Sequence, residues 1–174
     1  SGKNISEGKN IEDVVKQSEI IITMLPDGPA VKEVWQQITN LAFENTIIID
    51  CSTIDVKTSL EVQKNALNRN LLTLDAPVSG GVMGANDGTL TFMVGGERET
   101  YNKVKDLFEI MGNKNILCGS FGAGQSAKIC NNMLLASTMI AVGESFKLAK
   151  NLNLDIEKLY DVLSTSSGSC WAIN

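Results

Sequence analysis

The stretch that decides the fold runs from residue 20 to residue 75 and reads IIITMLPDGPAVKEVWQQITNLAFENTIIIDCSTIDVKTSLEVQKNALNRNLLTLD. Short apolar runs alternate in it with longer segments whose apolar residues recur at helical spacing. The pattern predicts extended segments at 20–24, 46–50 and 71–75, with helices at 30–40 and 55–68 between them. The same helical spacing predicts a helix at 11–19, just before this stretch. Such alternation is typical of βαβ units. We therefore expect an α/β protein with a parallel sheet covered by helices on both faces.

The sequence changes character after Gly119. Before it, a glycine-rich segment at 78–96 contains a β-like run at 89–94, followed by a predicted helix at 97–111 and a strand at 116–118. After it, residues 123–151 read as one long helix that is apolar around most of its circumference, and 155–164 read as a second helix with an acidic N-cap. We expect the long helix to be buried among other helices, at the start of an all-α domain. The predicted domains are 1–120 and 121–174.

Composition excludes several classes of protein. The 174 residues include no histidine, so histidine-based acid–base catalysis and histidine metal ligation are excluded. The net charge is −5 and no basic run follows a phosphate backbone, so we expect no nucleic-acid partner. No apolar run is long enough to cross a bilayer, and we expect no membrane partner. The four cysteines match no metal or disulfide pattern, which indicates reduced thiols and no metal site.

The first candidate for chemistry is Lys128, near the start of the predicted helix 123–151. Glycines at 122 and 124 permit close approach of a ligand, and free N–H groups at a helix start favour anions. A lysine in this position is unfavourable, because its charge opposes the helix dipole. An anionic ligand or a chemical role would compensate for this cost. Asn131 and Asn132 flank it on one polar strip. From spacing alone, an ordinary exposed lysine remains the alternative.

The second candidate is the loop Ser79-Gly80-Gly81, which follows a predicted strand. Its hydroxyl and consecutive N–H groups suit a small carboxylate. The alternative interpretation is a tight turn that needs positive φ angles.

The third candidate is a pair of strand ends, Leu25-Pro26 and Ser52-Thr53. A doubly wound sheet holds a nucleotide at such ends, although Ser52 and Thr53 are equally candidates for helix caps. No G-x-G-x-x-G follows a strand, so nucleotide binding does not follow from these residues alone.

Three motifs in order resemble the β-hydroxyacid dehydrogenase family. They are DAPVSGG at 75–81, GTLT with MVGG at 88–96, and G-x-G-x-x-x-K-x-x-N-N at 122–132. The resemblance implies a Rossmann-type nicotinamide-binding domain, then an all-helical domain whose first helix carries a catalytic lysine. It also implies that the first βαβ unit, with its phosphate turn, precedes Ser1 and that most of the helical domain follows Trp171. We thus expect a chain truncated at both ends that binds cofactor weakly by itself.

The resemblance assigns roles to single residues. Lys128 matches the proton-transfer lysine and is the expected catalytic residue. The expected substrate-binding residues are Ser79, Gly80 and Gly81, which grip a carboxylate, and Asn132, which orients the substrate. The expected cofactor-binding residues are Leu25, Pro26 and Thr53.

The function implied by the resemblance is the NAD-dependent oxidation of 3-hydroxyisobutyrate to methylmalonate semialdehyde, in valine degradation. NADP is the alternative cofactor. Alternative functions are reduction of tartronate or succinic semialdehyde, or a noncatalytic binding or assembly role. We expect a homo-oligomer, dimer or tetramer. The ending Cys170-Trp171 is similar to that of animal-type members, which implies the mitochondrial matrix, with the cytoplasm as the alternative for a bacterial protein.

Overall fold

The computed structural model describes residues 5–173 and divides the chain into two compact units, one ending at Lys128 and one beginning at Ile129. In chain order the elements are α1 (Ile11–Val15), β1 (Ile20–Thr23), α2 (Gly28–Leu41), β2 (Ile47–Asp50), α3 (Val56–Leu67), β3 (Leu72–Asp75), β4 (Val78–Ser79), α4 (Gly81–Asn86), β5 (Leu90–Gly96), α5 (Arg98–Met111), β6 (Gly112–Gly119), α6 (Ala123–Asn151) and α7 (Ile156–Thr165). The boundary between the units falls within α6. The expected domain division at residue 120 stays a prediction.

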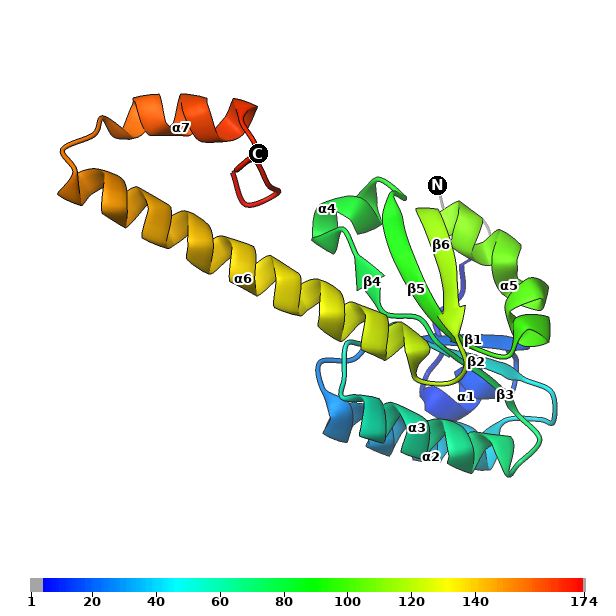
Figure 1. The fold of residues 1–174 in the computed structure, drawn as a ribbon. Coiled ribbons are helices and arrows are strands. Elements are labelled where there is room, and N and C mark those ends of the chain that lie inside the picture. Colours follow the sequence, from blue (N-terminus) through cyan, green and yellow to red (C-terminus); the bar gives the residue numbers. More distant parts are fainter. Residues whose placement is uncertain (1–4, 174) are drawn as a thin grey trace. The chain divides into compact units, whose positions relative to one another are not determined.

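The sheet of the first unit confirms the predicted βαβ units. Strands β1, β2 and β3 are parallel neighbours (Figure 1). Their last residues Thr23, Asp50 and Asp75 are in register. Beyond β3 the strand direction changes, because β5 pairs antiparallel with both β3 and β4, while β6 runs parallel to β5. Only β4 and the six-residue α4 separate β3 from β5, without the long crossover helix of a βαβ unit. The sheet is therefore mixed.

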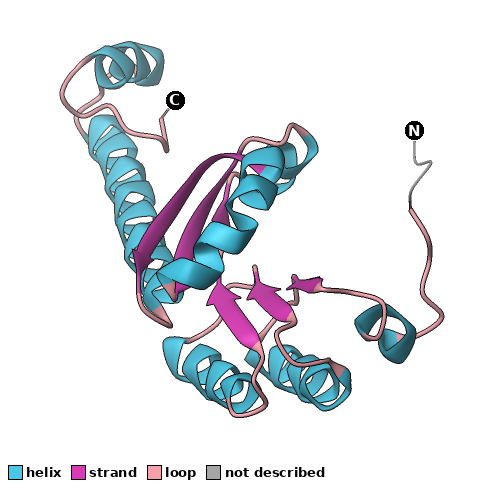
Figure 2. Cartoon of the chain, turned by 90° about the vertical axis from the view of Figure 1, so that its right-hand side faces the viewer, coloured by secondary structure: helices cyan, strands magenta, loops and turns pink. Residues whose placement is uncertain are grey.

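Helices cover both faces of this sheet (Figure 2). On one face α1, α2 and α3 pack on a core that includes Trp35 and Ile48, and on the other α5 packs on a core that includes Ile49 and Phe108. Successive strand residues point to opposite faces, so the three isoleucines of β2 contribute to both cores. This explains why the strand is apolar at consecutive positions.

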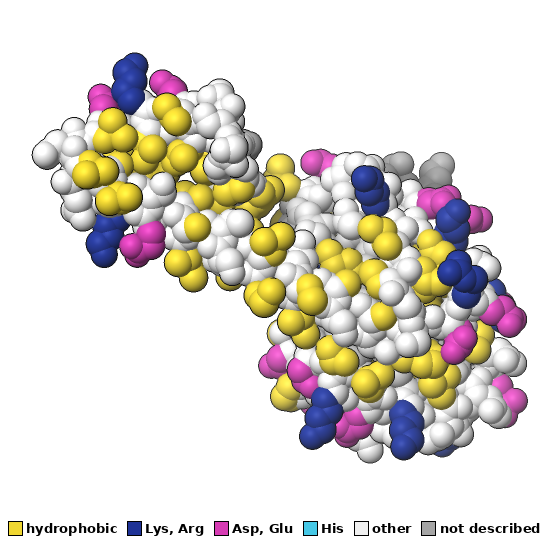
Figure 3. All heavy atoms as spheres, viewed as in Figure 1, with side chains coloured by type: hydrophobic (Ala, Val, Ile, Leu, Met, Phe, Trp, Pro, Cys, Tyr) yellow, Lys and Arg dark blue, Asp and Glu magenta, His cyan; other side chains and the backbone are white. Residues whose placement is uncertain are grey.

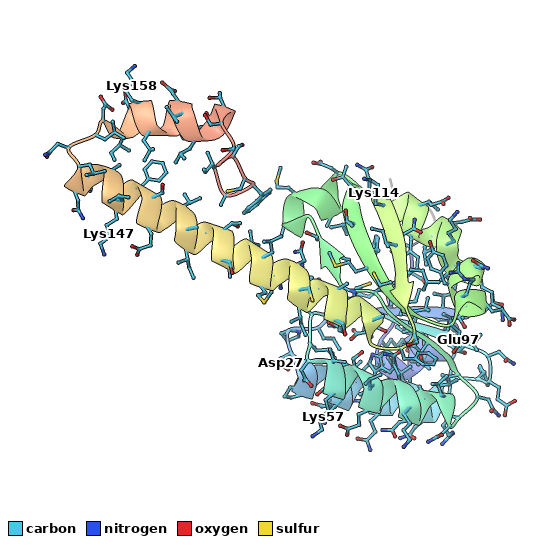
Figure 4. The ribbon with its side chains drawn as sticks, viewed as in Figure 1. Asp27, Lys57, Glu97, Lys114, Lys147 and Lys158 are labelled. Atoms are coloured by element: carbon cyan, nitrogen blue, oxygen red, sulfur yellow. The ribbon has the colours of Figure 1, made fainter. Side chains whose placement is uncertain are left out.

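Aspartates begin the helices that lead away from these strands. Asp27, labelled in Figure 4, caps α2 by accepting a hydrogen bond from the N–H of Ala30 at 2.9 Å. Asp55 does the same for α3 with the N–H of Thr58 at 2.8 Å. Asp155 caps α7, which confirms the acidic N-cap expected there.

Three local expectations differ from the structure. Ile20 and Ile22 of β1 are exposed, because β1 is an edge strand and α5 packs on β3, β5 and β6 instead. Residues 81–86 form the short helix α4 where the glycines indicated a loop. Strand β6 spans 112–119 and is longer than the predicted 116–118, because it pairs along β5.

The second unit consists of α6 from residue 129 onward, α7 and the following turn. The single long helix is confirmed. Among the described residues of this unit only Ala149 is fully buried. The expected burial of the helix among other helices therefore stays a prediction. Figure 3 shows hydrophobic side chains gathered over α6 and α7, and the exposed ones include Met133, Leu134, Ile140, Leu148 and Val162. No helix among residues 5–173 has the length and apolarity needed to span a membrane.

Candidate active site

Asp50, at the end of β2, organises the carboxyl ends of β1 and β2. Its Oδ1 accepts hydrogen bonds from Thr23 Oγ1 at 2.8 Å and from Ser52 Oγ at 2.6 Å. Ser52 Oγ in turn accepts the N–H of Leu25 at 2.8 Å. Trp35 Nε1 donates to Thr23 Oγ1 at 3.1 Å, so the network continues into the core. The loop that begins at Leu25 is thereby fixed to the loop after β2.

The other carboxyl oxygen of Asp50 is buried and has no hydrogen-bond partner. Burial raises the pKa of this carboxyl, and the hydrogen bonds from Ser52 and Thr23 oppose that effect. The folded state therefore binds this proton more tightly than the unfolded state does. The resulting stability is present below the ordinary aspartate pKa of about 3.9 and is lost as the pH rises through the raised pKa.

We expect the substitution Asp50→Asn to remove this loss of stability. An amide retains the Oδ1 acceptor and carries no charge at neutral pH, so the variant gains stability relative to wild type as the pH rises from about 4 to about 8. Urea unfolding of both proteins across this range measures the difference. A difference that is constant with pH, or that shrinks toward the upper end of the range, contradicts the prediction.

Asp75, at the end of β3, holds the start of α6. Its Oδ1 accepts the N–H of Gly122 at 2.8 Å and its Oδ2 accepts the N–H of Gln125 at 2.9 Å. The side chain is fully buried and is also contacted by Gln63 Nε2 at 3.3 Å. These helix N–H groups, predicted to favour an anionic ligand, bind a carboxylate of the protein itself.

Gln125 joins the same helix turn to the loop after β2. Its Oε1 accepts the N–H of Ile54 at 3.1 Å, and its Nε2 donates to the carbonyl oxygen of Ser52 at 2.7 Å. A Cβ on Gly124 would lie 2.2 Å from the carbonyl oxygen of Met93 and 2.7 Å from that of Asp75. The glycine predicted to admit a ligand therefore admits the backbone of β3 and β5.

Lys128 follows Gln125 by three residues and is half-buried. Partial burial disfavours the charged amine and lowers its pKa. None of the salt bridges formed by residues 5–173 includes Lys128. An amine with a lowered pKa and no carboxylate partner can accept a proton at a pH where an ordinary lysine cannot.

The loop Ser79-Gly80-Gly81 adopts the tight turn that the sequence offered as one interpretation. Gly80 has φ +128° and Gly81 has φ +60°, a region that L side chains avoid. Ser79 is half-buried in β4 and pairs with Thr91, while both glycines are exposed. Carboxylate binding by the loop stays a prediction.

The remaining expected site residues lie at strand ends and on α6. Leu25 is half-buried, whereas Pro26 and Thr53 are exposed at adjacent strand ends. Thr53 is not the cap of α3, since Asp55 fills that role. An apolar side chain, a proline ring and a hydroxyl at such an edge suit a nicotinamide and its ribose. Asn132 is exposed in the second unit, where its Oδ1 accepts from Asn131 Nδ2 at 3.5 Å.

Sequence reasoning missed Asp50 and Gln125 and gave Asp75 no role. An available signal was the aspartate at the end of each of two buried strands, since a buried carboxylate requires specific partners. Gln125 carries no comparable signal, because a glutamine in a first helical turn is ordinary. Within residues 5–173, no group of three or more metal-ligating side chains is placed to hold a metal ion.

Two family models match the chain. Residues 2–120 match the model described as the NAD-binding domain of 6-phosphogluconate dehydrogenase. Residues 122–174 match the model described as NAD-binding of NADP-dependent 3-hydroxyisobutyrate dehydrogenase. A probable 3-hydroxyisobutyrate dehydrogenase of Mycobacterium tuberculosis is 43% identical over 95% of this chain and 56% of the relative. The chain belongs to the 3-hydroxyisobutyrate dehydrogenase family. The resemblance seen in the three motifs is confirmed.

Other members of the 3-hydroxyisobutyrate dehydrogenase family agree with this assignment. The mitochondrial 3-hydroxyisobutyrate dehydrogenase of Drosophila melanogaster is 44% identical over 92% of this chain and 50% of the relative. The solved Mycobacterium tuberculosis 3-hydroxyisobutyrate dehydrogenase with L-serine superposes with a TM-score of 0.91 at 43% identity, over 96% of this chain and 57% of that one. The expected Rossmann-like α/β fold followed by a helical part is confirmed. The chain spans about half the length of the curated relatives that it matches.

Proposed function

We propose that the protein oxidises 3-hydroxyisobutyrate to methylmalonate semialdehyde with NAD as the cofactor. The single observation that carries the proposal is the half-buried Lys128, whose amine has a lowered pKa and no salt-bridge partner in the described chain. The family relationship supports the reaction class.

In the proposed step the Lys128 amine accepts the proton of the substrate hydroxyl while the adjacent carbon becomes a carbonyl. NAD, when bound, accepts the hydride that leaves this carbon. In the reverse direction the Lys128 ammonium returns the proton to the carbonyl oxygen. One proton and one hydride leave the alcohol, so the step balances.

Other residues of the chain bind and orient the reactants in this proposal. Leu25, Pro26 and Thr53 hold the nicotinamide half of the cofactor at the carboxyl ends of β1 and β2. The loop at 79–81 binds the substrate carboxylate, and Asn132 orients the substrate. NADP is the alternative cofactor. The proposal also divides the chain into a domain at 1–120 and a domain at 121–174.

The test is a substrate panel with the native gene product, purified from its source, since the relatives are about twice as long as this chain. We expect 3-hydroxyisobutyrate with NAD to give the highest kcat/KM among hydroxy acids that include glycerate, 4-hydroxybutyrate and L-serine. Faster reduction of tartronate or succinic semialdehyde would assign a reductase of the same family. Absence of turnover with every substrate would favour a noncatalytic binding or assembly role. Native mass spectrometry of the same sample gives its chain length and oligomeric state.

We also propose a homo-oligomer and a mitochondrial location. The exposed apolar side chains of α6 and α7 support self-association. Relatives from Drosophila melanogaster and Mus musculus are named mitochondrial, which supports that compartment for a eukaryotic source. For a bacterial source we propose the cytoplasm.

A further inference from the structure

Two buried side chains hold the first turn of α6 and have no role in the step proposed above. They are Asp75 and Gln125, and both are fully buried. We propose that they are positioning residues, which set the place of the Lys128 amine relative to the cofactor edge formed by Leu25 and Thr53. This inference rests on the proposed function of Lys128.

Asp75 determines both the depth and the rotation of the helix start. Its two oxygens accept N–H groups that lie three residues apart, those of Gly122 and Gln125. A single hydrogen bond leaves a helix free to pivot, whereas two bonds to one rigid carboxylate do not. The carboxylate is fixed to the sheet, because Asp75 ends β3 in register with Asp50. Asp75 therefore attaches the start of α6 directly to the ends of the parallel strands.

Gln125 relates the same helix turn to the proposed cofactor contact. Its amide group bonds the carbonyl oxygen of Ser52 and the N–H of Ile54, the two residues that flank Thr53. Both flanking residues are buried and Thr53 is exposed between them. One side chain, three residues before Lys128, thus fixes the loop that presents Thr53. Gln125 therefore sets the position of the Lys128 amine relative to the cofactor contact at Thr53.

The experiment compares Asp75→Asn and Gln125→Met in the native gene product. The Asp75→Asn variant retains one acceptor oxygen but places an NH₂ group against a backbone N–H. The Gln125→Met variant retains the side-chain length and the backbone N–H that Asp75 binds, but it loses both bonds to the Ser52–Ile54 loop. A displacement of about 1 Å lowers rates by about 100-fold. We therefore expect kcat to fall by about 10- to 100-fold, with little change in the KM for 3-hydroxyisobutyrate.

A second readout separates positioning from mere stability. If α6 moves, Lys128 becomes better hydrated and its pKa returns upward, so the acidic limb of the kcat/KM profile moves to higher pH. The control Val104→Ala makes a cavity in the core under α5, at a residue outside the hydrogen-bond network of Asp75 and Gln125. It destabilises the fold, and we expect it to leave both kcat per folded molecule and the pH profile unchanged.

A third readout requires no activity and uses the 174-residue chain. Hydrogen exchange of the Gly122 and Gln125 amides is expected to accelerate in Asp75→Asn, and that of Ile54 in Gln125→Met. Unchanged hydrogen exchange in both variants overturns the inference. So does an unchanged kcat and pH profile in both variants, and if Lys128→Ala is inactive in the same assay the proposed function stands. Full activity of Lys128→Ala overturns both. If Asp75→Asn does not fold, Gln125→Met decides alone.

Discussion

Replacing Lys128 with alanine is expected to lower kcat/KM for 3-hydroxyisobutyrate by about 100- to 10,000-fold, the usual contribution of a positioned acid–base group. The variant removes the only group proposed to accept the hydroxyl proton, and the 174 residues of this chain include no histidine that could replace it. Cofactor binding is expected to persist, because Leu25, Pro26 and Thr53 are unchanged. Steady-state kinetics and a cofactor titration of the native gene product measure both effects.

The pH dependence and two further variants test the role of Lys128 as a base. Activity of the wild type should rise with pH as the amine loses its proton, and burial places this rise below the ordinary lysine pKa of about 10.4. Lys128→Arg keeps the charge but cannot release a proton at any accessible pH, so it should be as inactive as Lys128→Ala. Lys147→Ala, on the exposed surface of the same helix (Figure 4), is the matched control. A fully active arginine variant would contradict the proton-transfer role.

The second large effect is expected from Gly124→Ala. The added Cβ would lie 2.2 Å from the carbonyl oxygen of Met93 and 2.9 Å from Asp75 Oδ2. A backbone carbonyl cannot turn away as a flexible side chain can, so the helix start must move or the sheet must deform. We expect the free energy of unfolding to fall by about 3 kcal/mol, the upper part of the usual range for overpacking. Urea unfolding followed by circular dichroism measures it.

The matched control for this substitution lies in the same helix. A Cβ on Gly143 meets no atom within 4 Å, so Gly143→Ala adds a methyl group to open space. Alanine is favoured over glycine in a helix interior by up to about 1 kcal/mol, and this variant should be equal to or more stable than wild type. Equal stability of both alanine variants would show that α6 does not pack on the strands at Gly124.

Local pattern was enough to predict most of the first unit. Three isoleucines in a row at β2 predicted burial on both faces, and the structure places them in two cores. The same run in β1 leaves Ile20 and Ile22 exposed, so the pattern alone did not show which strand lies at the edge of the sheet. The helical spacing of α2 and α3 was equally readable, since one apolar face per helix is a local property. The direction of β5 was not, because antiparallel pairing with β3 depends on contacts between residues distant in sequence. Strand β6 lengthened for the same reason.

The candidate site divides in the same way. Lys128, Ser79 and Thr53 were found from motifs, because the chemistry of a site requires particular side chains at particular spacings. Their roles as catalytic, substrate-binding and cofactor-binding residues stay predictions for the kinetic tests above. Asp75 and Gln125 were missed as partners, because 50 residues separate them along the chain in the bond from the Gln125 N–H to Asp75 Oδ2.

The sequence by itself determined the family, the βαβ order of the first unit and the lysine near the start of the long helix. Only the tertiary structure decided what binds the start of that helix. Periodicity and motifs describe each segment by itself. They show that the free N–H groups of a helix start require hydrogen-bond acceptors, but they do not show which residue supplies the acceptor. The acceptor here is Asp75, because the fold brings the end of β3 to the first turn of α6.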